Sequence, residues 1–277
     1  MTLQLLAEGH LQKLRIELQT PARYRLPVGD QEIELNPYLG KQIRLTFMGA
    51  INCQHCGRLT KKSFSQGFCY PCFQSLPQCD SCIMSPEKCH FHLGTCRDPQ
   101  WGEQQCMQDH YVYLANSSGV KVGITRGTQI PTRWLDQGAI QALPVLKVAT
   151  RYQSGLVETA FKDYVTDRTN WQAMLKNQVD LIDMHEQRVQ LIEQLEPQLQ
   201  TLEKRFGLQA IQRLEHSPVQ DIEYPVLNYP HKVTSLSFDK TPVVEGMLQG
   251  MKGQYLILDT GVINIRKFAA YKIQFAA

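Results

Sequence analysis

The 277-residue sequence lacks any apolar run of about 18 residues, the length that a membrane-spanning helix needs. Residues 1–14 lack a basic stretch followed by an apolar block, so a secretory signal is not expected. The chain has little net charge, +3, and composition alone therefore does not indicate a nucleic-acid partner. We expect a cytoplasmic protein with no membrane partner.

Cysteine is absent from most of the chain, because all nine cysteines lie between Cys53 and Cys106. A disulfide framework is typical of short secreted chains. A dense cluster in a longer chain without a signal instead indicates reduced thiolates that hold metal. The composition is 43% hydrophobic and 20% charged, which is sufficient for buried cores. The length is that of roughly two domains, at about 100–200 residues each.

The patterns along the chain predict an α+β fold in five segments. Period-2 alternation predicts a β segment over residues 1–52, and residues 53–107 form a zinc-ribbon-like, cysteine-rich block with little core of its own. Residues 108–171 have an α/β pattern, residues 172–215 a helical one, and residues 216–277 return to strands. Pairing of the two terminal β segments into one small β-barrel, with everything between them inserted, is left open by the sequence.

The first cysteine group consists of two CxxC pairs with twelve residues between them. Each pair supplies two thiolates from one tight turn, and together they complete a tetrahedral four-thiolate zinc site. Gly57 and Gly67 stand beside the pairs and allow the turns to fold back. A redox dithiol and plain buried cysteines are the alternatives. The predicted ligands are Cys53, Cys56, Cys69 and Cys72.

The second cysteine group offers seven candidates for four positions. These are Cys79, Cys82, Cys89, His90, His92, Cys96 and Cys106. The simplest ligand set is Cys79, Cys82, Cys89 and Cys96; a histidine or Cys106 in place of one of the last two is the alternative. Zinc is the expected ion, although four thiolates also accept an iron–sulfur cluster. Because a closed four-thiolate shell leaves no open position, both sites are interpreted as structural.

The segment after the cysteines starts with a predicted β-hairpin. Two short β runs, residues 111–114 and 120–124, flank a polar turn. A helix is predicted after Pro131, and another after Ser154, which we interpret as its N-cap. Glu158 falls within this second helix, at the edge of a face that should be buried. Its carboxylate therefore needs a partner or a metal, because burying an unpaired charge is costly.

This order of residues resembles a divergent GIY-YIG endonuclease domain. The resemblance covers residues 108–171 and implies a small α/β fold. The whole chain is also similar to a bacterial family that joins such a domain to a cysteine-rich block. Residue by residue, Tyr111 or Tyr113 resembles the tyrosine of the first motif, Val122 and Gly123 the end of the second motif, Arg133 the helical arginine, Glu158 the metal ligand and Asn170 the late asparagine.

The resemblance implies one-metal phosphodiester hydrolysis. In that chemistry Tyr111 or Tyr113 assists the attacking water, Arg133 stabilises charge on the phosphate, and Glu158 binds Mg²⁺ or Mn²⁺. The glycine of the first motif is missing, and Lys121 stands where the second motif would carry its tyrosine. A lysine there contacts phosphate, or serves as a base if burial lowers its pKa.

Positive charge is concentrated next to these positions. Residues 111–151 carry five basic side chains and a single acidic one, Asp136, in a chain whose net charge is +3. Such a local surplus is typical of a phosphate-binding surface and favours DNA or RNA as the partner. Residues 264–268 also mix basic and apolar side chains. This pattern is typical of a strand face that binds nucleic acid, and equally of an ordinary solvated strand. The candidates for phosphate contact or base stacking are Thr125, Arg126, Trp134, Gln137 and Arg151.

Residues 172–206 carry apolar side chains at helical intervals and more acidic than basic ones, so this segment is a poor nucleic-acid surface. Pro197 interrupts the pattern, and we expect a kink or two helices. We expect this stripe of apolar side chains to pack either on its own domain or on a second copy of the chain, in a homodimer. Three functions remain open: a metal-dependent endonuclease, a catalytically inactive nucleic-acid-binding module that contains zinc, and a zinc-stapled protein-interaction scaffold.

Overall fold

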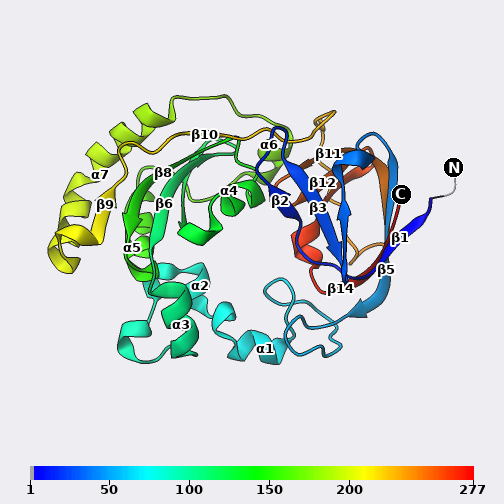
Figure 1. Cartoon of the computed structure of the whole chain (residues 1–277), viewed down its shortest axis with the longest axis horizontal. Coiled ribbons are helices and arrows are strands. Elements are labelled where there is room, and N and C mark those ends of the chain that lie inside the picture. The colour runs from blue at the N-terminus through cyan, green and yellow to red at the C-terminus, as the bar shows by residue number, and fades with distance from the viewer. Residues whose placement is uncertain (1–2) are drawn as a thin grey trace.

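The computed structural model describes residues 3–277 as an α+β fold with three antiparallel sheets (Figure 1). The largest sheet has six strands in the order β1 (Leu5–His10), β14 (Tyr271–Ala276), β5 (Gln42–Ile51), β11 (Val243–Lys252), β12 (Tyr255–Leu258) and β13 (Gly261–Asn264). Strands from both ends of the chain therefore pair. Within residues 3–277 they do not close into a barrel, because β1 and β13 are the two edges of this sheet.

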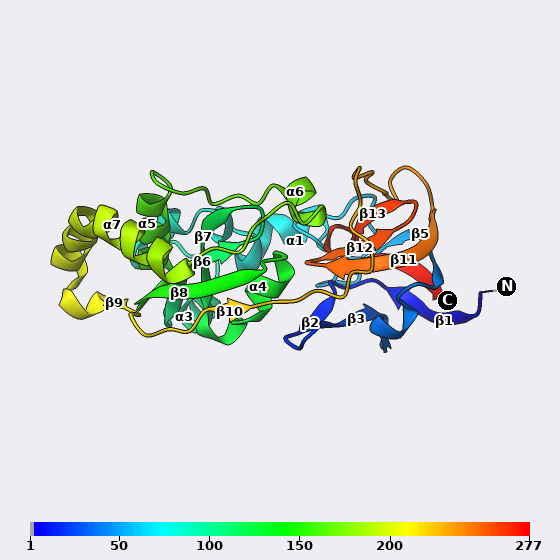
Figure 2. The ribbon, with the colours of Figure 1, turned by 90° about the horizontal axis from the view of Figure 1, so that it is seen from above.

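The middle of the chain forms a second sheet, of five strands. Its order is β10 (Gln220–Asp221), β8 (Gln141–Val148), β6 (His110–Asn116) and β7 (Val120–Arg126), and β9 (Ile211–Arg213) also pairs with β8. Strands β6 and β7 form the predicted hairpin. Helices α5 (Arg151–Phe161) and α7 (Met184–Phe206) pack on this sheet (Figure 2). The core between them includes Val112, Leu114, Val157, Leu195 and Leu199.

A third, three-stranded sheet completes the β structure, with the order β2 (Arg15–Glu17), β3 (Arg23–Val28) and β4 (Gln31–Glu34). The largest hydrophobic cluster runs through all three sheets. It unites Tyr113 and Trp134 from the middle of the chain with Leu26 from β3 and Phe275 from β14. Since apolar burial is the dominant stabilising term, the middle and the terminal parts of the chain depend on one shared core.

The helix predicted after Pro131 is α4 (Thr132–Asp136), whereas the predicted start of the next helix is wrong. Helix α5 begins at Arg151, and Ser154 lies fully buried inside it. The reason is a capping box: the Thr150 side chain accepts a hydrogen bond from the Gln153 backbone, and the Gln153 side chain accepts one from the Thr150 backbone. Ser154 instead donates from its hydroxyl to the carbonyl of Arg151 at 2.7 Å.

Two helices cover the predicted helical segment, but they do not divide at Pro197. Helix α6 (Trp171–Leu175) ends well before α7, and Pro197 lies inside α7. Much of the apolar stripe of α7 packs on its own chain, since Leu191, Leu195 and Leu199 join the core over the five-stranded sheet, whereas Val189 is exposed. None of the helices described over residues 3–277 is both long and apolar enough to cross a membrane.

The cysteine-rich block contains only short helices and spans the gap between the two larger sheets (Figure 1, cyan). Its α-helices are α1 (Tyr70–Ser75), α2 (Ser81–Met84) and α3 (Pro99–Cys106). The described residues 3–277 also form seven short 3-10 helices: η1 (Asn36–Tyr38), η2 (Pro77–Cys79), η3 (Pro86–Lys88), η4 (Phe91–Leu93), η5 (Gly127–Gln129), η6 (Leu208–Ala210) and η7 (Ile265–Phe268).

Candidate functional site

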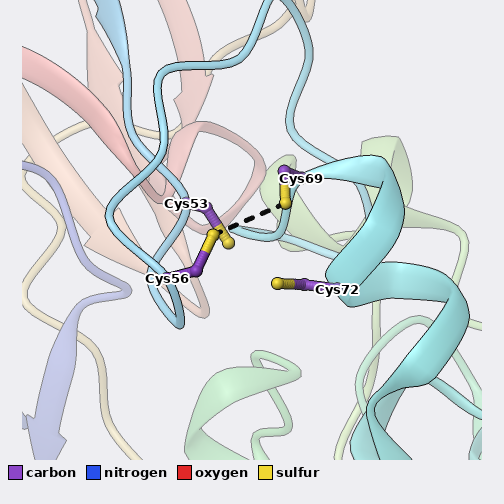
Figure 3. Close-up of side chains that lie close together, drawn as sticks. All are labelled: Cys53, Cys56, Cys69 and Cys72. Carbon is purple, nitrogen blue, oxygen red and sulfur yellow. Dashed lines mark hydrogen bonds between the residues drawn. The ribbon is translucent and has the colours of Figure 1, made fainter.

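The first cysteine group converges as its spacing predicts (Figure 3). Cys53 and Cys56 come from the turn after β5, Cys69 caps the N-terminus of α1, and Cys72 lies in its first turn. One sulfur from each residue lies within 4.8 Å of the other three, and the sulfurs of Cys56 and Cys69 are 3.7 Å apart. This four-thiolate group is compatible with a structural metal such as zinc.

Gly57 and Gly67, beside this group, have the positive φ angles that tight turns need, as their positions in the sequence predicted. Gly57 has a φ of +70° and Gly67 one of +138°, both in the region that favours glycine. The surroundings act differently on two of the thiols: burial and the neighbouring thiols raise the pKa of Cys72, whereas the backbone favours ionisation of Cys53. Burial opposes the Cys53 thiolate, but hydrogen bonds from the backbone of Cys56, Cys69 and His55 outweigh it and lower the pKa of Cys53 to about 6.

A second feature is a cavity of about 320 Å³ where the hairpin, α4, α5, the cysteine-rich block and the C-terminal region meet. Five cationic side chains and two carboxylates line it, so the wall is strongly basic. Of the sequence candidates, Thr125, Arg126, Arg133, Arg151 and Glu158 reach it. The complete charged lining is Lys13, Arg126, Arg133, Arg151, Arg266, Asp136 and Glu158.

Helix α5 supplies two charged groups of the cavity from one face. Arg151 and Glu158 are seven residues apart, which is about two turns, and both side chains point into the cavity. Gly155, between them on that face, lies directly against the cysteine-rich block, because a Cβ there would be 2.3 Å from the backbone nitrogen of Glu87. The block thus docks on the same helix face that carries the charged groups.

Guanidinium groups crowd one another in this cavity. Burial lowers the pKa of Arg151 and also that of Arg266, and the like charge of Arg133 lowers both further. Arginine nevertheless stays protonated, so the repulsion among these groups persists. Lys13 is paired at 2.7 Å with Asp136. The four arginines of the cavity lining are therefore left with one carboxylate, that of Glu158. A bound anion would relieve this repulsion.

Glu158 is the other carboxylate of the cavity. Its side chain is only 14% exposed, and its ion-pair partner is Lys162, 3.9 Å away, rather than Arg133. Burial raises the pKa of Glu158, although Lys162 partly offsets this effect. Lys162 is also bound more closely, at 3.0 Å, by Asp167. The Glu158 carboxylate is therefore incompletely neutralised, which is suitable for holding a cation.

The two tyrosines and Lys121 are not part of the cavity lining. Tyr113 is fully buried, and its hydroxyl donates to the side-chain oxygen of Gln137 at 3.2 Å. Gly123, opposite it in the hairpin, makes room for the ring, since a Cβ there would lie 2.6 Å from the hydroxyl oxygen. Tyr111 packs its ring on Gly127.

Lys121 is nearly inaccessible, and its ammonium group donates to the hydroxyl of Thr169 at 2.6 Å. Burial lowers the pKa of Lys121 to about 8, and Arg133 contributes to the shift. Asn170 lies at the surface, where its side chain caps α6 by accepting from the backbone nitrogen of Ala173 at 3.1 Å. Neither Lys121 nor Asn170 lines the cavity.

Trp134 and Gln137 are also absent from the cavity wall. Trp134 is only 4% exposed, in the shared core, where its ring lies 6.1 Å from that of Tyr113. A ring in this position cannot stack on a base, and the expectation of a stacking tryptophan is wrong. The short helix α4 turns Arg133 outward to the cavity and its neighbour Trp134 inward, because consecutive helical residues point about 100° apart.

The second cysteine group is only partly as the simplest set predicts. Cys82, Cys89 and Cys96 line one small cavity together with Cys106, whereas Cys79 does not. The thiol of Cys79 instead contacts the side chain of Ser65. All nine cysteines are free thiols.

Lys13 and Arg266 were not singled out as site residues from the sequence. Each is far in the chain from the hairpin, and only the shared core brings them to it. For Arg266 a weak signal existed in the basic character of residues 264–268. Lys13 stands in a segment with no distinguishing pattern.

Comparison with known proteins gives a family but no relative of known activity. A family model with the description "Protein of unknown function (DUF2797)" matches residues 40–273. The matched region includes the first cysteine group and every charged residue of the cavity except Lys13. No curated protein and no solved structure matches this chain.

Proposed function

The chain belongs to the DUF2797 family, and from its basic cavity we propose that it binds nucleic acid and cleaves phosphodiester bonds with a divalent metal ion. The observation that carries the proposal is the crowding of four arginines around the single carboxylate of Glu158, once Asp136 has paired with Lys13. Guanidinium groups bind phosphate in a planar, bidentate manner, and nucleic acid presents phosphates in series.

The arginines come from separate elements and surround the cavity. Arg126 ends β7, Arg133 is on α4, Arg151 begins α5 and Arg266 is on η7. Asp136 and Arg266 also line an adjoining pocket that includes Lys267. A basic path therefore continues from the cavity along the C-terminal sheet, as a ligand with more than one phosphate requires.

Glu158 is the residue that we propose as the ligand of Mg²⁺ or Mn²⁺. These ions are often held by one or two carboxylates together with phosphate oxygens of the substrate. The donor set present here, one incompletely paired carboxylate among phosphate-binding arginines, fits that pattern. When bound, such an ion polarises the phosphate and lowers the pKa of coordinated water. Arg133 and Arg151 would orient the phosphate and stabilise the charge that develops on it.

The buried phenol of Tyr113 is a poor candidate for a general base. Burial raises the pKa of Tyr113, which keeps its hydroxyl protonated near neutral pH. Lys121 has a lowered pKa but donates to Thr169 and is not part of the cavity lining. Glu158 would hold the metal ion that supplies activation of the water, and we give Tyr113 a positioning role through Gln137 and Arg133.

We also propose that the first cysteine group holds zinc. The lowered pKa of Cys53 and the convergence of four sulfurs are both features of structural zinc knuckles. The loop between the two cysteine pairs contacts a residue of the cavity wall. In this loop, the side chain of Gln66 accepts a hydrogen bond from the guanidinium of Arg266. Zinc at this group would hold one of the phosphate-binding arginines in place.

Binding and cleavage can be tested separately with the full-length protein. Fluorescence anisotropy with short single- and double-stranded DNA and RNA should show an affinity that falls steeply with added salt. Cleavage of the same molecules is assayed with and without Mg²⁺ or Mn²⁺. Glu158→Gln should abolish cleavage and retain binding, because it removes a negative charge without changing the shape. Arg133→Ala should weaken both. Absence of any salt-dependent binding contradicts the whole proposal.

A nucleic-acid-binding module without activity is the second candidate. It is favoured by one observation: the position of the second-motif tyrosine is taken by Lys121, whose ammonium group faces Thr169 and not the cavity. This candidate predicts salt-dependent binding by the wild-type protein and by Glu158→Gln, and no cleavage of any substrate with either metal.

A further inference from the structure

Four thiols outside the first group face one small cavity of the cysteine-rich block. Cys82 is on α2, Cys89 follows η3, Cys96 lies in the next loop and Cys106 ends α3. Cys82, Cys89 and Cys106 are 8%, 7% and 5% exposed. None of the four belongs to the hydrophobic clusters found among residues 3–277. Their burial is therefore not explained by packing in an apolar core.

The local geometry of α3 favours convergence on this cavity. A Cβ at Gly102 would lie 3.0 Å from the sulfur of Cys96 and 2.9 Å from the ring of Phe91, so only glycine leaves space for both. Cys106 follows four residues later and lies on the same face of the helix. The glycine thus lets Cys96 approach the helix face from which Cys106 projects.

Of the other candidates in this region, Asp80 and His90 also line the cavity, but each already has a polar partner. Cys79 does not line the cavity, and its thiol contacts the side chain of Ser65. The carboxylate of Asp80 is 2.8 Å from the guanidinium nitrogen of Arg97 and also caps α2. His90 has its Nδ1 atom 2.8 Å from the hydroxyl of Thr95.

We propose that Cys82, Cys89, Cys96 and Cys106 bind a second zinc ion in this cavity. Four thiolates are a complete tetrahedral shell for zinc, and the block has too little apolar core to fold around an empty centre. Within residues 3–277, the ligand atoms at this cavity that all lie within 4.8 Å of one another are those of Cys82, Asp80 and His90. Zinc would therefore draw the other three sulfurs inward. The assignment does not depend on the proposed nuclease function.

The test is the metal content of the purified full-length protein, measured by elemental analysis against protein concentration. We expect two zinc ions per chain in the wild type and in Cys79→Ser, and one in Cys106→Ser. Cys79 is the matched control because it is an equally buried cysteine of the same block. A zinc content of one in the wild type overturns the proposal. So does a loss in Cys79→Ser with none in Cys106→Ser, or iron in place of zinc.

A second measurement needs no variant and so does not depend on the folding of Cys106→Ser. X-ray absorption at the zinc edge should show a shell made up of sulfur alone, at about 2.3 Å for every zinc ion. A shell that includes nitrogen or oxygen at about 2.0–2.1 Å would place His90 or Asp80 among the ligands and contradict the four-thiolate set.

Discussion

Arg151 donates a hydrogen bond of 2.6 Å from its guanidinium group to the carbonyl oxygen of Ile83. This bond joins the first residue of α5 to the residue after Cys82. The guanidinium also lines the basic cavity. A side chain proposed to bind phosphate is therefore held in position by the cysteine-rich block, which gives the block a role in the geometry of the cavity.

The contact between α5 and the block should be sensitive to added volume at Gly155. Gly155→Ala would place a Cβ 2.3 Å from the backbone nitrogen of Glu87, so one of the two elements must move. Overpacking of this kind costs about 1–3 kcal/mol, which exceeds the roughly 1 kcal/mol that alanine contributes to a helix. Urea unfolding should show a lower free energy of unfolding for Gly155→Ala. A variant as stable as the wild type would show that the two elements are not tightly docked.

Arg266 should contribute to nucleic-acid affinity although it lies far from the hairpin in sequence. Arg266→Ala removes a cation from the cavity, so affinity should fall for all sequences and the slope of log affinity against log salt should decrease by about 1. Lys272→Ala is the control, because it removes the same charge from β14, where Lys272 pairs with Glu8. If the two substitutions reduced nucleic-acid affinity equally, the loss would reflect the net charge of the protein and not binding in the cavity.

Trp134 should behave as a core residue. Trp134→Ala should lower the free energy of unfolding by about 3–5 kcal/mol, as for other large-to-small core substitutions. Trp134→Phe retains most of the apolar volume and should leave nucleic-acid affinity at the wild-type value in anisotropy titrations, since the ring is buried. A marked loss of affinity in this folded variant would restore the role of a stacking ring.

Lys121 should make stability depend on pH. Burial lowers its pKa in the folded protein to about 8 from an ordinary value of 10.5. Between these values the unfolded chain binds more protons than the folded one, so the contribution of Lys121 to stability increases as pH rises through this window and is lost as pH falls through it. Lys121→Met should remove this contribution.

The measurement is urea unfolding of the wild type and of Lys121→Met across the same pH range. Burial also lowers the pKa of Lys252, in β11, to about 8, and this group titrates in both proteins, so the difference between them isolates Lys121. A difference that stays constant with pH would mean that Lys121 is not desolvated as the structure indicates.

Several features followed directly from local sequence. The β6–β7 hairpin, the helix after Pro131 and the convergence of Cys53, Cys56, Cys69 and Cys72 all depend on residues near one another in the chain. The start of α5 did not follow, because Thr150 and Ser154 are both acceptable caps. Only the reciprocal bond with Gln153 distinguishes Thr150.

The sequence by itself therefore determined the α+β class, the four-thiolate group and the region in which basic residues are concentrated, since each depends on local spacing or composition. Tertiary structure decided which side chains face the cavity. It placed Arg266 and Lys13 with Arg133 around one cavity, buried Trp134 in the core, and left Cys79 outside the small cavity that Cys82 lines. The physical reason is that a shared hydrophobic core, built from both ends of the chain, sets these positions, and local patterns carry no information about such long-range packing.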